Sequence, residues 1–337
     1  MGSVTVVIPT RDRPALLDLT LTSVLRQRNV ELLVTVVDDG SIEDVGAVVA
    51  RRRDARVRCV RHETPQGVSR CRNRGWMEAT TEWVAFCDDD DLWSPDKLQN
   101  QVKAAEQSDR DWGYAGAVSV NHELRVHMGA PPLEPDAMVA ALPRYNAMPA
   151  GASNVLVRRT VLQRIGGFDP TLTHVPDWEL WLRLARHSKP AWVCEPSVAY
   201  RFHGGNASFR TGEMLAELGE LERRFHVRAD RARFHRHLAW LCMRSGRHSE
   251  ALAHFTRAYI RVQDRYTRLD VAHDLRLVRE QAVESLLRRL VRRQPTAVRS
   301  AAPPRSPWRA QAQAWIDDLL REATAAEVPE TGPTFIR

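Results

Sequence analysis

The hydrophobic and polar positions of this chain follow two different periods. Over residues 1–105, short continuous apolar runs alternate with segments that carry apolar residues at helical spacing. Continuous apolar runs are typical of strands buried on both faces, and helical spacing is typical of the helices that cover them. The expected strands are 4–8, 32–37, 57–60 and 83–87, and the expected helices are 16–25, 44–53, 69–79 and 95–105. This βαβ alternation predicts an α/β domain with a mostly parallel, Rossmann-like sheet.

A different pattern begins at about residue 210, where glycine becomes scarce and helical periodicity takes over. It runs over residues 214–291, and residues 238–258 have the character of one tetratricopeptide-type helical hairpin. A Pro-rich break follows at 295–307, before a last expected helix at 308–323. We therefore predict an α/β domain, an all-α domain, and a linker with a terminal helix and tail, at residues 1–210, 211–294 and 295–337.

Polar clusters stand where three of the predicted strands end. They are Thr10-Arg11-Asp12, Asp38-Asp39 and the run Asp88-Asp89-Asp90-Asp91. In doubly wound α/β sheets, ligands bind at the carboxyl ends of the strands. These clusters are therefore the first candidates for a binding site.

The aspartate run has its own chemistry. Four consecutive carboxylates repel one another and are tolerated only where water or a cation neutralises them. An oxygen-rich site suits Mg²⁺ or Mn²⁺, which also bridge phosphates. The alternative is an exposed turn, or a cap for the helix expected at 95–105.

Composition sets the expected location of the chain. No run of about 18 apolar residues is present, and the N-terminus reads directly into a strand, so neither a membrane span nor a secretory signal is expected. The five cysteines are scattered without a paired spacing, which argues against a disulfide framework or a zinc cage. A cytoplasmic location is expected.

The net charge of +7 lies entirely in the C-terminal part. Residues 1–210 carry 26 charges of each sign, whereas residues 211–337 carry 23 arginines against 16 acids. The segment Arg288–Arg309 holds seven arginines and no acid. It forms either a solvated helix face with a linker, or a peripheral contact with an anionic surface; nucleic acid is not an expected partner.

Six motifs in order resemble family 2 glycosyltransferases of the GT-A fold over residues 3–210. They are Val6–Thr10, Val36–Ser41, Gly67–Gly75, Phe86–Leu98, Gly166–Asp169 with Asp177–Trp181, and Tyr200–Ser208. The resemblance implies an inverting transferase that uses a divalent metal, Mn²⁺ or Mg²⁺, and a nucleotide-sugar donor, with UDP expected first. The expected acceptor is a natural product, a peptide or a glycan.

The resemblance also assigns roles on the donor side. Asp39 is expected to bind the nucleotide base, and Asp88 to lie near the ribose or the metal. The full set of expected nucleotide-binding residues is Pro9, Thr10, Arg11, Asp39, Arg72, Asp88 and Asp89. Asp90 is the expected metal ligand, and His203 either reaches the metal or diphosphate or makes a structural hydrogen bond.

On the acceptor side, Asp177 is the expected catalytic base. Burial beside tryptophans would raise its pKa toward neutrality, although the acid that the family usually has just before it is Pro176 here. The alternative is that Asp177 only caps the following helix. The other expected acceptor-side residues are Trp178, Glu179 and Ser153.

Three other functions compete with this one. The chain could bind nucleotide sugars without transfer, or act as an adaptor through its basic helical tail. A nucleotidyltransferase is disfavoured because no Gly-rich basic phosphate loop opens the chain. The helical C-terminal region is also a candidate homodimer interface.

Overall fold

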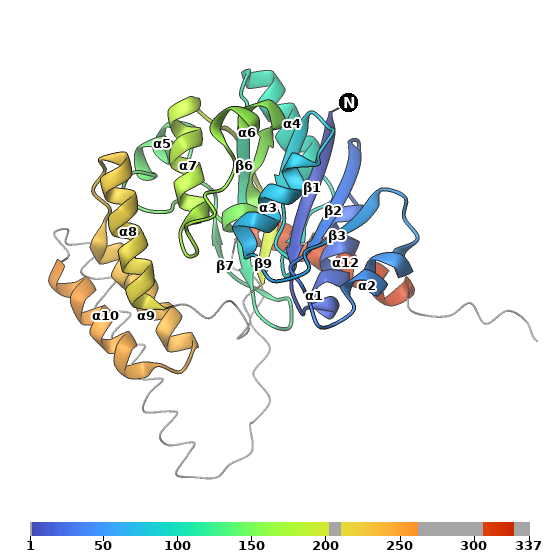
Figure 1. Cartoon of the computed structure of the whole chain (residues 1–337). Coiled ribbons are helices and arrows are strands. Elements are labelled where there is room, and N and C mark those ends of the chain that lie inside the picture. Colours follow the sequence, from blue (N-terminus) through green and yellow to red (C-terminus); the bar gives the residue numbers. More distant parts are fainter. Residues whose placement is uncertain (1, 202–209, 262–305, 327–337) are drawn as a thin grey trace, which may run out of the picture. The chain divides into compact units, whose positions relative to one another are not determined.

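The computed structural model of the chain describes residues 2–201, 210–261 and 306–326 (Figure 1). Contacts divide the chain into two compact units, each described by itself below. The sheet unit comprises described residues of 1–142, 147–203 and 302–337, and the helical unit comprises those of 143–146 and 204–301. The domain boundaries expected from the sequence differ from this division chiefly in the placement of the last helix.

The sheet unit is built on one mixed sheet, in which nine strands are described. The strand order is β3-β2-β1-β4-β8-β6-β9-β5, and β7 pairs with β6. The strands are β1 Ser3–Thr10, β2 Glu31–Asp38, β3 Val57–Arg61, β4 Trp83–Phe86, β5 Leu92–Trp93, β6 Trp112–Val120, β7 Val126–Ala130, β8 Leu156–Arg158 and β9 Ala191–Arg201. The first four strands are mutually parallel, as predicted, while β8 joins both β4 and β6 in antiparallel pairs.

Strand β1 explains why the N-terminal apolar run has no polar face. Val4, Val6 and Ile8 are fully buried and belong to a core that also contains apolar residues of helices α1 (Pro14–Leu25) and α4 (Lys97–Ser108). Val7 points to the opposite face, where helix α3 (Val68–Met77) lies close to it. Because successive strand residues alternate between faces, a strand covered on both sides must be apolar throughout.

The close approach of α3 to β1 depends on Gly75. A Cβ at this position would lie 2.2 Å from a methyl carbon of Val7. We expect Gly75→Val to lower the free energy of unfolding by about 1–3 kcal/mol or more, because the added carbons overpack a filled core. Urea unfolding followed by circular dichroism measures the change. Gly219→Ala is the control: this glycine lies inside helix α8 (Thr211–Phe225) with open space around it, so alanine there should stabilise by about 0.5–1 kcal/mol. Equal effects at both positions would contradict the packing argument.

The last helix, α12 (Pro307–Ala326), packs on the sheet. Its apolar residues Ala312, Trp315, Ile316 and Leu319 share a core with residues of β5, β6, β7 and β9. The indole N–H groups of Trp308 and Trp315 donate to the backbone carbonyls of Cys194 and Pro196, at 2.7 and 2.8 Å. In Figure 1 this red helix lies beside the blue helix α1 from the start of the chain, and an Arg26–Glu322 ion pair of 2.8 Å joins the two. The sequence pattern identified the helix but gave no sign of where it packs.

The helical unit contains helices α8 (Thr211–Phe225), α9 (Arg231–Arg244) and α10 (His248–Arg261). Helices α9 and α10 form the predicted hairpin, in which the rings of Trp240 and Phe255 meet edge to face at 5.7 Å. His235 and His254 are buried between these helices, with their Nδ1 atoms 3.0 Å apart. Burial, followed by the neighbouring His254, lowers the pKa of His235 to about 4, so it is neutral at pH 7. Tyr259, near the end of α10, is 48% exposed.

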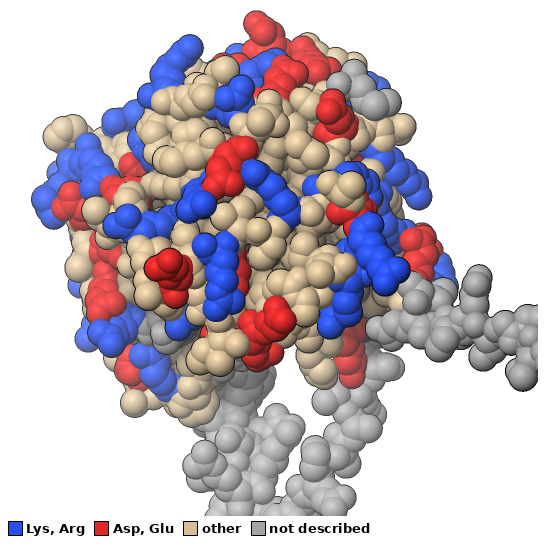
Figure 2. Space-filling view, turned by 45° about the vertical axis from the view of Figure 1, so that its right-hand side comes forward, with Lys and Arg blue, Asp and Glu red and all other residues tan. Residues whose placement is uncertain are grey.

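Surface charge does not concentrate on the face drawn in Figure 2, where basic and acidic side chains are interspersed. The predicted arginine-rich segment lies largely outside the described residues, so the peripheral anionic contact stays a prediction. Every helix in the described ranges is too short or too polar to cross a membrane.

Candidate functional site: the carboxyl ends of β1, β2 and β4

The sheet register brings the three polar clusters together. Thr10, the last residue of β1, pairs with Asp38, the last residue of β2. The backbone N–H of Asp39 donates to the carbonyl of Thr10 at 2.9 Å. On the other side of β1, the N–H of Cys87 donates to the carbonyl of Val7 at 3.0 Å, which places the aspartate run beside the same strand end. The site sits where parallel-sheet geometry predicted it.

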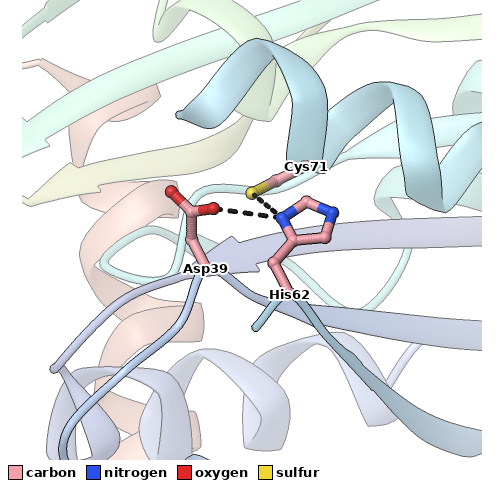
Figure 3. A group of neighbouring side chains, drawn as sticks. All are labelled: Asp39, His62 and Cys71. Atoms are coloured by element: carbon pink, nitrogen blue, oxygen red, sulfur yellow. Dashed lines mark hydrogen bonds and ion pairs between the residues drawn. The ribbon is translucent and has the colours of Figure 1, made fainter. Parts of the chain in front are cut away.

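The carboxylate of Asp39 is held from three directions (Figure 3). The backbone N–H of Gln66 and Nδ1 of His62 contact its Oδ1 at 2.7 and 3.1 Å, and the N–H of Gly67 donates to Oδ2 at 2.9 Å. Burial by itself raises the pKa of Asp39, but these hydrogen bonds outweigh it and hold the pKa below its ordinary value. Asp39 is therefore a fixed carboxylate at neutral pH. Gly67 has a φ of +89°, which permits the turn that aims its N–H at Asp39.

Each aspartate of the run has a different environment. Asp88 accepts from Arg72 at 2.5 Å, and its own N–H donates to Oγ of Ser153 at 2.9 Å. Arg13 lies between two of the other carboxylates, 3.3 Å from Oδ1 of Asp89 and 3.1 Å from Oδ2 of Asp90. Arginine side chains from helices and loops thus partly neutralise a cluster that would otherwise repel itself.

Three of the four aspartates, Asp89, Asp90 and Asp91, are buried, and Asp88 is partly exposed. Asp91 is fully buried and accepts from the N–H of Arg201; burial first, then the charges of Asp90 and Asp88, raise its pKa well above the ordinary range. Asp89 is 4% exposed and accepts from Oγ1 of Thr10 at 2.7 Å, and burial raises its pKa to about 6. The oxygens of Asp89 bind Thr10 and Arg13 inside the fold, and its contact with the nucleotide stays a prediction.

Asp88 and Asp90 are the residues of the run that fit a divalent cation. Both offer carboxylate oxygens, the donors that Mg²⁺ and Mn²⁺ prefer, and their present cationic partners are arginines that a metal could replace. The side chain of Asp88 is 32% exposed, so it is open to a ligand from solvent.

The predicted base, Asp177, lies at the second position of helix α7 (Pro176–His187). Its Oδ1 accepts from the N–H of Trp178 at 2.7 Å. Its Oδ2 faces Gly151, where a Cβ would come within 3.2 Å of it. Gly151 begins the short turn η1 (Gly151–Asn154), which also carries Ser153. Asp177 and Asp88 therefore lie against the same turn, Asp177 beside Gly151 and Asp88 beside Ser153.

The two acceptor-side candidates on α7, Trp178 and Glu179, are buried in the fold, and their acceptor role stays a prediction. Trp178 is 2% exposed and its indole N–H donates to the carbonyl of Leu142 at 2.8 Å. Glu179 is 3% exposed and its carboxylate pairs with Arg183 at 2.6 Å. Arg183 in turn donates to the carbonyls of Ile165 and Gly167, so this pair fixes the turn before the helix.

The other predicted site residues lie in different environments. Ser153 is fully buried and its Oγ accepts from the backbone N–H of Asp88, so it positions that residue; its acceptor role stays a prediction. The side chain of Arg11 is 54% exposed and reaches only Asp12, at 3.6 Å, among its described ion pairs. His203 lies outside the described residues. Pro9 and Thr10 close β1 at the site edge, as expected from their strand.

Four contributors to the site were not predicted. Arg13 and Arg201 each contact the aspartate run, and His62 and Cys71 lie against Asp39. Arg13 could have been suspected, because it directly follows the polar cluster at the end of the first strand. His62 and Cys71 carried no spacing signal, because the turn between β3 and α3 brings them together.

Comparison with known proteins finds similarity to glycosyltransferases. Residues 5–166 match the sequence profile described as Glycosyl transferase family 2. A glycosyltransferase of Haemophilus influenzae is 26% identical over 209 residues, covering 61% of this chain and 70% of the relative. The Escherichia coli protein WfaP, a UDP-Glc:alpha-D-GlcNAc-diphosphoundecaprenol beta-1,3-glucosyltransferase, is 23% identical over 192 residues, covering 56% of this chain and 73% of WfaP.

A solved structure shares the architecture. The structure of S. aureus TarS 1–349 in complex with UDP-GlcNAc superposes with a TM-score of 0.54 at 17% identity. The match covers 67% of this chain and 65% of the TarS chain, slightly less than two thirds of it. At this identity the likeness speaks for the fold alone, and it confirms the predicted GT-A class. The chain is therefore a glycosyltransferase, and its residues 5–166 are similar to glycosyl transferase family 2.

Proposed function

We propose that this chain is a metal-dependent, inverting glycosyltransferase that takes its sugar from a UDP-sugar. Two Escherichia coli relatives, WfaP and WfgD, are named for UDP-Glc as donor, and the TarS structure is of a UDP-GlcNAc complex. The same two relatives act on a diphosphoundecaprenol-linked GlcNAc, which favours a saccharide acceptor over a peptide here.

The observation that carries the proposal is the turn η1. It holds the backbone of Asp88 through Ser153 and contacts the carboxylate of Asp177 through Gly151. The donor diphosphate and the acceptor hydroxyl must meet within bonding distance for transfer to occur. The turn lies against both proposed half-sites, which supports such a meeting point.

On the donor side, Asp39 is proposed to accept a hydrogen bond from the uracil ring, with Pro9 and Thr10 lining its pocket. Arg72 and Asp88 are proposed to lie at the ribose and diphosphate. Asp90, with Asp88, would hold a divalent cation, which supplies positive charge to the departing diphosphate. Arg72 adds a second positive charge that the structure already fixes beside Asp88.

On the acceptor side, Asp177 is proposed to accept the proton of the attacking hydroxyl. As that proton leaves, the acceptor oxygen forms a bond to the anomeric carbon, and the bond from this carbon to the diphosphate oxygen breaks on the opposite face. The products are an inverted glycoside and UDP. The hydrogen bond from the N–H of Trp178 keeps one oxygen of Asp177 occupied and leaves the other directed at the turn.

Replacing Asp39 tests the donor half of the proposal. We expect Asp39→Asn to weaken UDP binding about 10- to 100-fold, because it removes a charged acceptor whose hydrogen bonds are worth about 1.5–3 kcal/mol. Isothermal titration calorimetry with UDP measures the change. Asp54→Asn is the control. Like Asp39, Asp54 accepts a hydrogen bond from a backbone N–H, that of Arg56 at 3.0 Å, but it lies in the turn before β3. Unchanged UDP affinity in Asp39→Asn would remove Asp39 from the donor site.

A further inference from the structure

Asp39 and two neighbouring side chains together have the chemistry of a metal site that is distinct from the aspartate run. Asp39, His62 and Cys71 each offer one ligand atom, and these atoms all lie within 4.8 Å of one another. Asp39 and Cys71 are buried and the side chain of His62 is 13% exposed, so water does not separate them. A mixed oxygen, nitrogen and sulfur set selects zinc-like ions over Mg²⁺ and Mn²⁺.

The contacts converge on a single atom. Figure 3 shows the carboxylate of Asp39 and the thiol of Cys71 both reaching Nδ1 of His62, at 3.1 and 3.7 Å. In a tetrahedral zinc site with Zn–N of about 2.0–2.1 Å and Zn–S of about 2.3 Å, neighbouring ligand atoms lie about 3.3–3.6 Å apart. The two measured separations bracket this range. An ion bound at Nδ1 of His62, where these contacts converge, could therefore be coordinated by all three ligands after small side-chain rotations.

We propose that Asp39, His62 and Cys71 form a Zn²⁺ site, and that an ion bound there competes with the nucleotide base for Asp39. Zinc binding needs no new chain segment: three protein ligands and one water complete four-coordination. The route for the ion lies beside His62, which with Gln66 lines an open surface hollow of about 740 Å³. Zinc binding stands on these three residues alone, whereas the competition rests on the proposed role of Asp39 in the donor site.

The charges of the three ligands determine whether Zn²⁺ binding releases a proton. Asp39 is a carboxylate, while burial, and then the charge of Asp39, raise the pKa of the Cys71 thiol far above neutrality. Binding therefore releases the thiol proton: Zn²⁺, one carboxylate, one imidazole and one thiol give a Zn–thiolate complex and one H⁺. The thiolate and carboxylate together cancel the charge of the ion in the buried site.

Cobalt substitution tests the site directly. We expect Co²⁺ added to the full chain to produce the near-ultraviolet cobalt–thiolate charge-transfer band, and Zn²⁺ but not Mg²⁺ to abolish it. Cys71→Ser and Cys71→Ala should remove the band, while Cys59→Ser, at an exposed cysteine on β3, should keep it. No band in the wild type, or a band that survives both Cys71 variants, overturns the zinc site.

A second measurement tests the competition. With Zn²⁺ at ten times its own dissociation constant, the apparent Kd for UDP should rise about tenfold in the wild type. Free UDP also binds some Zn²⁺, which raises the apparent Kd for UDP in any protein. Cys71→Ser measures this background, so Zn²⁺ should raise its Kd for UDP much less than it raises that of the wild type. An equal rise in both proteins overturns the competition. UDP affinity in zinc-free buffer with Mn²⁺ tests the donor site separately. Failure of the proposed donor site is therefore distinguishable from failure of the proposed zinc competition.

Discussion

Asp177→Asn is expected to lower the rate of UDP release from a UDP-sugar about 10²- to 10⁴-fold, the range over which a positioned general base contributes. Asparagine keeps the size of the side chain and can still accept the N–H of Trp178, so helix α7 should keep its start. What it cannot do is take a proton from the attacking hydroxyl or water. Donor affinity should stay within about twofold, because the proposed base contacts the attacking hydroxyl and not the donor.

The chain offers a matched control for this experiment. Helix α5 (Pro135–Ala141) begins with the same dipeptide as α7, so Asp136 occupies the position in α5 that Asp177 occupies in α7. The side chain of Asp136 is 80% exposed and pairs with Lys189. Asp136→Asn should leave turnover unchanged. If both variants keep wild-type turnover, Asp177 serves only the helix start, and the catalytic base is another group.

Asp90→Asn is expected to have the second-largest effect, on both turnover and metal response. Loss of one carboxylate ligand from a site of two should lower turnover about 100-fold or more, since the cation contributes several kcal/mol to stabilising the leaving group. In the wild type, Mn²⁺ should tighten UDP binding at least about tenfold relative to EDTA. In Asp90→Asn this ratio should fall to about one. Titration of UDP with and without Mn²⁺ measures it.

Asp96→Asn is the control for this prediction, because Asp96 lies near the run, before α4, and makes no capping hydrogen bond. It should show the wild-type metal response. Arg13 should remain in place in Asp90→Asn through its contact with Asp89, so the fold of the loop is preserved. If UDP binds the wild type equally well in EDTA and in Mn²⁺, the aspartate run does not act through a metal.

The strands and the meeting of polar clusters could be predicted because each rests on local rules. A strand covered on both faces must be apolar throughout, and parallel strands must end at one edge. The amino-acid pattern alone therefore predicts that Asp39 and Asp88 lie at the same edge of the sheet. The second half of the sheet was less predictable. Strands β8 and β6 pair antiparallel beside β4, and nothing in their short apolar runs encodes a direction.

Side-chain partners were the least predictable feature, because they depend on tertiary packing. Asp89, Asp90 and Asp91 are buried while Asp88 is partly exposed. The sequence of four identical residues does not predict this difference. Lys97 is fully buried with its ammonium 3.8 Å from the centre of the Trp93 ring, in a position that composition alone would place at the surface. The packing of α12 on the sheet was equally unpredictable, because the amphipathic pattern of a helix predicts a buried face but not the element that covers it.

The central claim is that the carboxyl ends of β1, β2 and β4 bind a UDP-sugar. The measurement that tests it most directly is calorimetric titration of the full chain with UDP-, GDP- and dTDP-sugars in Mn²⁺ and in Mg²⁺, repeated with Asp39→Asn. We predict that at least one UDP-sugar binds, more tightly than its GDP counterpart, and that Asp39→Asn removes this preference. Binding of no nucleotide sugar with either metal, or binding that Asp39→Asn leaves unchanged, would contradict the account.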